Sequence, residues 1–81
     1  MNMEIGKQIL EDGTELYVPF KRTLIEENNI LVPYEPFETI GEALEWCTRD
    51  SFDPVADMNE IIEKMCDPQM KSEALQFINE R

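Results

Sequence analysis

The side chains of this chain that could do chemistry are carboxylates. The 81 residues include eighteen Asp and Glu against seven Lys and Arg, which gives a formal net charge of -11. The sequence has no histidine, so it lacks the usual general base, the Ser-His and Cys-His pairs of hydrolases, and the imidazole ligand of most zinc sites. A domain of this length also has little room for a substrate cleft. We therefore expect a protein that is not an enzyme and that uses no metal or other cofactor.

The position of the carboxylates is as informative as their number. Residues 26–67 hold twelve acidic and two basic residues, a net charge of -10, whereas the rest of the chain is nearly neutral. Along most of this block the acids recur at steps of three and four residues. On a helix such steps place side chains about 5–6 Å apart on one face. The carboxylates of the predicted binding site are Glu35, Glu38, Glu42, Glu45, Asp50, Asp53, Asp57 and Glu60.

Two interpretations of this row are open. A spacing of about 5–6 Å approaches that of the phosphates along a nucleic-acid strand. The row would then bind a protein with a basic surface, such as a nuclease or another nucleic-acid-binding protein, while the same charge argues against direct binding to nucleic acid or to a membrane. Tyr34 and Trp46 lie among the acids and would be apolar anchors of that site, unless they pack in the core. In the other interpretation the acidic face is solvated and only keeps a small protein soluble.

In length, acidity and absence of catalytic groups the chain resembles small phage-encoded proteins that switch off host nucleic-acid enzymes, among them anti-CRISPR proteins and DNA-mimic inhibitors. The resemblance implies a viral or mobile-element protein that acts in the host cytoplasm and competes for a basic nucleic-acid-binding groove. The alternative is a small intracellular interaction module or regulatory subunit whose acidic face is only solvated. Such a module would bind through its sheet or through Met58, Met65 and Met70. The oligomeric state stays open.

Several other residues have structural explanations. Asp50, Asp53 and Asp57 lack the alternating positions and the central glycine of a calcium loop, and helix caps explain them better. Cys47 and Cys66 lie on apolar arcs without a C-x-x-C spacing, so we expect buried, inert thiols in a reducing compartment. The chain shows neither the features of a signal peptide nor an apolar run of the roughly 18 residues that a membrane span needs. These features favour a cytoplasmic location.

The first predicted element is a β-hairpin centred on Asp12-Gly13, a dipeptide typical of two-residue type I′ turns. Such a turn predicts the pairs Ile5–Phe20, Lys7–Val18 and Ile9–Leu16. The five apolar residues of these pairs, all but Lys7, would then share one buried face of the hairpin. Pro19 would point to the other face and would indicate an edge strand.

A third strand and the helices follow. Ile30–Tyr34 is a short apolar run that predicts a strand. Residues 22–29 are ambiguous: 24–27 fit a helical turn, and Asn28-Asn29 indicates a loop or turn. Thr39 and Glu42 form a capping box for a helix over residues 40–49, and Asp53-Pro54 and Asp67-Pro68 start two more helices. Phe37 and Phe52 are expected between the sheet and the helices. The sequence thus predicts a single compact α+β domain over residues 1–81, with a small antiparallel sheet (1–34) covered by two or three C-terminal helices (38–81).

Overall fold

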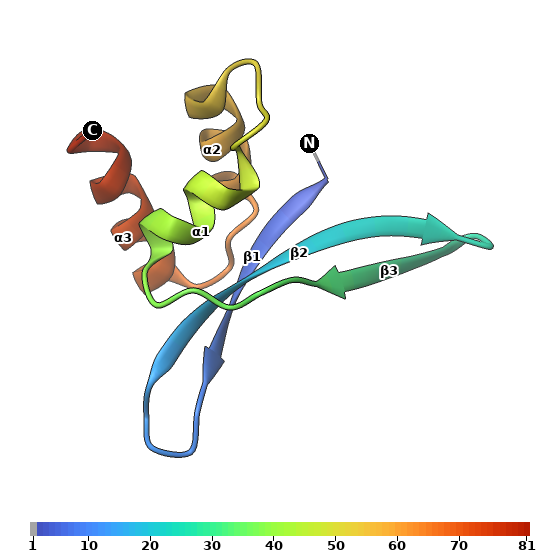
Figure 1. The fold of residues 1–81 in the computed structure, drawn as a ribbon, viewed down its shortest axis with the longest axis horizontal. Helices are drawn as coiled ribbons and strands as arrows, with labels where there is room; N and C mark the ends of the chain where they lie inside the picture. The colour runs from blue at the N-terminus through green and yellow to red at the C-terminus, as the bar shows by residue number, and fades with distance from the viewer. Residues whose placement is uncertain (1) are drawn as a thin grey trace.

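A computed structural model describes residues 2–81 of the chain. Its elements are β1 (Met3–Ile9), β2 (Glu15–Ile25), β3 (Asn28–Pro33), α1 (Ile40–Cys47), α2 (Pro54–Glu63) and α3 (Pro68–Asn79). The strands form one antiparallel sheet in the order β1-β2-β3, and the helices follow it in the chain (Figure 1). The predicted α+β class is therefore confirmed.

The predicted pairing of β1 with β2 is wrong by one residue. Ile5 lies opposite Pro19, Lys7 opposite Tyr17, and Ile9 opposite Glu15. The turn has three loop residues rather than two, since the Leu10 N–H donates to the Thr14 carbonyl over 2.8 Å. Gly13 takes a positive φ of 88°, as expected for the last residue of a three-residue loop.

The shift by one residue moves side chains to the opposite face of the sheet. Tyr17 and Pro19 face the helices and are buried, whereas Leu16, Val18 and Phe20, which were predicted for the core, lie on the other face. Val18 is nevertheless buried there, at 8% exposure, outside the main core cluster. Nor does Pro19 mark an edge strand, because β2 is the central strand. The side of Pro19 that lacks an N–H faces the chain just beyond the end of β3, so no hydrogen bond between β2 and β3 is lost. On that same side the Pro19 carbonyl accepts the Tyr34 N–H.

The ambiguous residues 22–29 continue β2 and form a tight turn into β3. Ile25 lies opposite Asn28, which leaves Glu26 and Glu27 as the two turn residues. Their φ values of 49° and 68° are both positive, as in the type I′ turns that connect twisted strands. The end of β2 and β3 therefore form a two-stranded arm that projects away from the helices (Figure 1).

The core lies between the helices and the β1–β2 part of the sheet. α1 buries Ala43 and Leu44, and α2 buries Met58 and Ile61. The largest core cluster consists of Ile5, Tyr17, Ile40, Ala43, Leu44, Cys47, Met58, Ile61, Ile62, Met65, Met70 and Ala74. The arm contributes no residue to this cluster.

All three predicted helix starts are confirmed. The Thr39 hydroxyl accepts the Glu42 N–H of α1 over 3.2 Å, and the carboxylates of Asp53 and Asp67 cap α2 and α3 in the same way. α1 is shorter than expected. It ends at Cys47, and Thr48 caps it by donating its hydroxyl to the Leu44 carbonyl over 2.9 Å.

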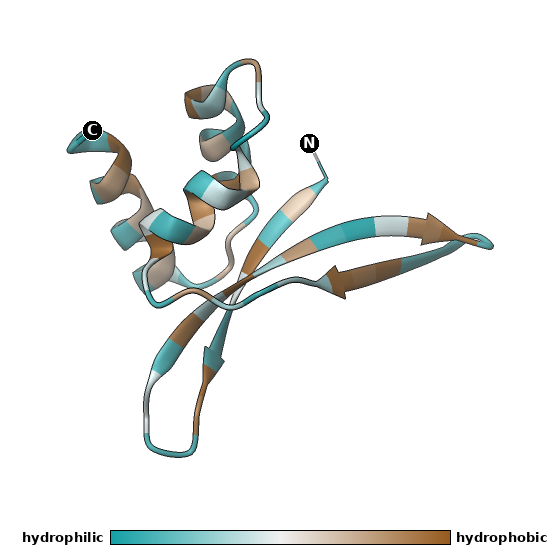
Figure 2. Ribbon diagram, viewed as in Figure 1, coloured by the Kyte–Doolittle hydropathy of each residue, from teal (hydrophilic) through white to brown (hydrophobic). Residues whose placement is uncertain are grey.

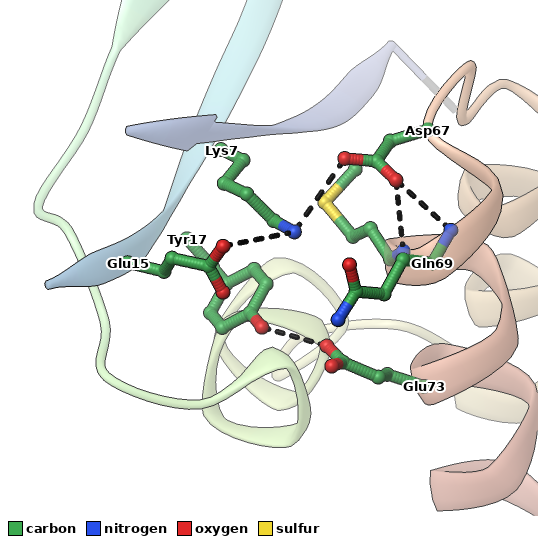
Figure 3. Close-up of polar contacts among 7 residues, drawn as sticks. Lys7, Glu15, Tyr17, Asp67, Gln69 and Glu73 are labelled. Carbon is green, nitrogen blue, oxygen red and sulfur yellow. Dashed lines mark hydrogen bonds and ion pairs between the residues drawn. The ribbon is translucent and has the colours of Figure 1, made fainter. Parts of the chain in front are cut away.

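A group of polar side chains ties the sheet to the start of α3 (Figure 3). Lys7 Nζ lies 3.5 Å from the Asp67 carboxylate and 3.7 Å from that of Glu15. The Tyr17 hydroxyl donates to Glu73 over 2.7 Å. The Met70 N–H and, more weakly, Lys7 hold the pKa of Asp67 below its usual value. These contacts satisfy the polar atoms at a half-buried junction, so they explain the fold rather than a site.

Candidate functional site

The eight predicted carboxylates lie along one continuous part of the chain, from the end of β3 to the middle of α2. Glu35 and Glu38 are in the linker before α1, and Glu42 and Glu45 are on α1. Asp50 and Asp53 lie in the connection to α2, and Asp57 and Glu60 are on α2 itself. All are exposed except Asp57, which is half-buried. Most apolar residues of both helices lie on their inner sides, as the sequence pattern predicts. Val55, at the start of α2, is an exception and is 45% exposed.

Three of these carboxylates make local contacts. Asp53 caps α2 by accepting the Ala56 N–H over 3.3 Å. Asp57 accepts a short hydrogen bond from the Ser51 hydroxyl. Asp50 lies 3.6 Å from the neighbouring Arg49 guanidinium. Helix capping and local hydrogen bonding thus explain the acids at positions 53 and 57, whereas the Arg49–Asp50 pair is fully at the surface and contributes little.

The carboxylates of residues 35–45 have no such role. The side chains of Glu35, Glu38, Glu42 and Glu45 make no ion pair or hydrogen bond with any residue between 2 and 81. The ion pairs of Lys7, Arg22 and Arg49 do not involve these carboxylates, although Glu45 lines an open pocket together with Arg49 and Arg81. We call Glu35, Glu38, Glu42 and Glu45 the acidic ridge; none of the four forms an ion pair within residues 2–81.

Tyr34 and Trp46 are brought together. Their ring centres lie 4.9 Å apart, and the ring centre of Phe37 lies 6.2 Å from that of Trp46. The Arg49 guanidinium lies 4.6 Å from the Trp46 ring centre. This aromatic group fixes the linker against α1, while Tyr34 keeps 38% of its surface exposed. Both residues thus have a structural role and still reach the surface.

A shallow, open pocket of about 530 Å³ lies beside this group. Four predicted site residues line it: Tyr34, Trp46, Asp50 and Asp57. The acidic ridge, Asp53 and Glu60 are not part of its lining, so the structure splits the predicted site into a ridge and a pocket. The pocket also contains two bases, Lys21 and Arg49, that the spacing of acids did not indicate.

The thiol in this pocket is unreactive at neutral pH. It belongs to Cys47, which is buried as predicted, and burial raises its pKa to about 11. A thiol with that pKa stays protonated and unreactive near pH 7. Among residues 2–81, no three Asp, Glu or Cys side chains gather in a way that could hold a metal ion.

Phe52 is a surface residue that the sequence analysis placed in the core. The prediction is wrong: the side chain is fully exposed, at 105% of its reference area. Phe52 lies in the connection between α1 and α2, where the chain leaves the helical layer before Asp53 caps the next helix. An exposed aromatic ring between Asp50 and Asp53 is a typical anchor of a protein interface. The one sign of this exposure in the sequence is that Phe52 lies on neither of the two apolar helical arcs.

Cys66 is also exposed, contrary to the prediction of a buried thiol. The prediction placed Cys66 on the apolar arc of a helix that extended past residue 63, whereas α2 ends at Glu63. Cys66 instead lies in the short connection to α3.

Comparisons with protein-family models, with curated proteins and with solved structures found no match for this chain. No helix within residues 2–81 is long and apolar enough to cross a membrane. The functional argument therefore depends on the surface alone.

Proposed function

We propose that this protein is a non-catalytic inhibitor that binds the basic nucleic-acid-binding groove of a host defence or other nucleic-acid enzyme. The observation that carries the proposal is the acidic ridge. Glu35, Glu38, Glu42 and Glu45 are exposed and have no basic partner among residues 2–81. Unneutralised charge on a small protein attracts a surface of opposite charge and raises the rate of encounter.

Phe52, exposed in the connection between α1 and α2, would add an apolar contact to the binding site. Charge pairs at the rim of an interface contribute little net affinity, whereas a buried aromatic anchor contributes more. Phe52 lies within three residues of Asp50, Asp53 and Arg49 in the chain. If a partner buried the Phe52 ring, these charged residues would surround the apolar contact. The ridge would steer the partner, and Phe52 would hold it.

The alternative function, an interaction module with a merely solvated acidic face, is favoured by a different observation. Five large apolar residues are exposed in and beside the arm: Leu24, Ile25, Ile30, Leu31 and Val32. An apolar patch of this kind on a small protein is typical of a binding surface.

A competition assay separates the two functions. Purified nucleases and other basic nucleic-acid-binding proteins are loaded with a fluorescent DNA duplex, and displacement by this protein is measured at about 0.1 M and about 0.5 M salt. The double substitution Glu42→Lys/Glu45→Lys should abolish displacement. Glu11→Lys/Glu80→Lys changes the net charge equally at exposed positions outside the ridge and should preserve most of it.

Displacement that is equal at both salt concentrations, or equal in the two double variants, would exclude binding through the acidic ridge. Binding to the same proteins without loss of their DNA would instead support the interaction module.

A further inference from the structure

The outer edge of β3 is an open strand edge. β3 is the last strand of the sheet, and all six of its residues are exposed. The Tyr34 N–H points toward β2, where it donates to the Pro19 carbonyl over 2.9 Å. Because backbone groups of successive residues alternate in direction along a strand, the N–H and C=O groups of Asn29 and Leu31 point outward. Pro33 also faces outward, so its lack of an N–H does not disturb the pairing with β2.

This edge lacks the usual protection. Proteins commonly block an edge strand with a charged side chain, a bulge or a covering segment. Residues 28–32 carry no charge, and the pairing with β2 runs without a bulge from Phe20–Pro33 to Ile25–Asn28. The only blocking residue is Pro33, at the end of the strand.

The arm around this edge is apolar on both faces. Leu24 is 68% exposed and Leu31 is 44% exposed on one face, while Ile30 and Val32 are about equally open on the other. Figure 2 shows these stretches in brown at the end of β2 and along β3, away from the helices. A strand that added to β3 would therefore bury apolar side chains as well as pair its backbone.

Carboxylates stand at both ends of the edge. Glu26 and Glu27 form the turn before β3, and Glu35 follows two residues after it. The two turn positions have positive φ and favour Asn or Gly, so glutamates there are not explained by turn geometry. The edge thus presents an apolar centre between two acidic ends.

We propose that the β3 edge binds an extended segment of the basic partner as a fourth, antiparallel strand, with an apolar centre facing residues 29–32 and Lys or Arg at each end. The inference rests on the proposed function and specifies how the partner is held. A second copy of this chain fits the edge less well. Antiparallel pairing centred on Ile30 would place Glu35 of one copy beside Glu26 of the other at both ends, between two molecules of charge -11.

The test uses the full chain and a synthetic peptide, Lys-Lys-Thr-Val-Thr-Val-Thr-Lys-Lys, with a matched peptide that has Glu in place of Lys. Amide hydrogen exchange is followed by NMR. The lysine peptide should slow exchange at Asn29 and Leu31 about tenfold or more, and the glutamate peptide should not. Slowing that is confined to other residues, or equal for the two peptides, would overturn the inference.

Two variants control the result. Leu31→Pro removes one outward N–H without removing a hydrogen bond to β2, and it should abolish peptide protection. Because proline can disturb the arm, Glu26→Lys/Glu27→Lys is the second variant; it changes only exposed turn side chains and should weaken the lysine peptide about tenfold or more. Full peptide binding by both variants would contradict docking at this edge.

The outcome is separable from that of the proposed function, because the peptide assay contains no nucleic-acid-binding protein. If Glu42→Lys/Glu45→Lys abolishes DNA displacement while Leu31→Pro leaves it intact, the strand-docking inference fails and the proposed function stands. Protection of Asn29 and Leu31 that appears without peptide and grows with protein concentration would assign the edge to a second copy instead.

Discussion

The Tyr17 hydroxyl links the sheet to α3 through its 2.7 Å hydrogen bond to Glu73. This bond, together with burial of the ring, raises the pKa of Tyr17 to about 12. A pKa above the unfolded value of about 10 means that the folded state holds the phenolic proton more tightly. The stabilisation is therefore fully present below pH 10 and is lost as the pH rises toward 12.

We predict that Tyr17→Phe removes this pH dependence. The difference in the free energy of unfolding between the original protein and Tyr17→Phe should shrink as the pH rises from about 10 to about 12. Chemical denaturation at several pH values measures it, and the other titrating groups cancel in the difference. A difference that stays constant over this range would mean that the hydroxyl does not hold its proton in the fold.

Phe52 is the residue for which stability and binding separate most clearly. Since the ring is fully exposed, Phe52→Ala should change the free energy of unfolding by less than about 0.5 kcal/mol. If the ring anchors a partner, the same substitution should weaken binding by about 2 kcal/mol or more, roughly thirtyfold. Displacement titrations with Phe52→Ala would measure the loss of binding, with Val55→Ala at an exposed position of α2 as the control. If both substitutions weakened binding equally, Phe52 would not be an anchor of the interface.

At the scale of elements, the two β-turns show what the sequence could and could not predict. Asp12-Gly13 correctly placed a hairpin, but a glycine with positive φ fits loops of two and of three residues. The choice between them shifted the register and turned Tyr17 and Pro19, in place of Leu16 and Phe20, toward the helices. The sequence indicated the second turn at Asn28-Asn29, two residues too late, because the actual turn residues Glu26 and Glu27 carry none of the Asn or Gly preference of their conformation.

The helices were easier to predict because their starts depend on local chemistry. Thr39, Asp53 and Asp67 cap the N–H groups within three residues of themselves, which a sequence displays directly. The exposure of the acidic ridge was predicted from the three- and four-residue spacing of its glutamates. By contrast, the pocket between β2 and α1 joins Lys21 to residues more than twenty positions away, and no local pattern could place them together.

The β2–β3 turn should be improvable, because left-handed backbone costs a residue other than Gly about 1–2 kcal/mol. We predict that Glu26→Asn/Glu27→Gly stabilises the arm by about 1–2 kcal/mol. Hydrogen exchange at Thr23 and Ile30, which face each other across the arm, would report the gain as slower exchange. Gly13→Ala in the first turn is the opposite control and should destabilise its hairpin, since its φ is 88°. Unchanged exchange at Thr23 and Ile30 would show that the turn conformation is not strained.

At the scale of the whole molecule, charge is distributed unevenly between two parts. Lys7 pairs with Glu15 on the sheet and with Asp67 at the start of α3, and Arg22 pairs with Glu4. The acidic ridge forms no ion pair within residues 2–81, although Glu45 lines a pocket with Arg49 and Arg81. Arm and ridge are also adjacent in the chain, since Glu35 directly follows Tyr34 after β3. One partner could therefore contact the apolar edge and the charged ridge together.

Salt should act on folding and on binding in opposite directions. A net charge of -11 on 81 residues repels itself in the compact state, and screening relieves this repulsion. Raising sodium chloride from about 0.05 M to about 0.5 M shortens the Debye length from roughly 14 Å to roughly 4 Å. We therefore predict that the midpoint of urea unfolding rises with salt while the affinity for a basic partner falls. A midpoint that falls with salt would mean that ion pairs such as Lys7–Asp67 outweigh the repulsion. Affinity that rises with salt would mean that the apolar arm alone holds the partner.

Glu45→Gln should act at constant salt as added salt does: it should stabilise the fold and weaken binding. The substitution removes a carboxylate near the C-terminal end of α1, where the helix dipole disfavours negative charge, so we expect the fold to gain a few tenths of a kcal/mol.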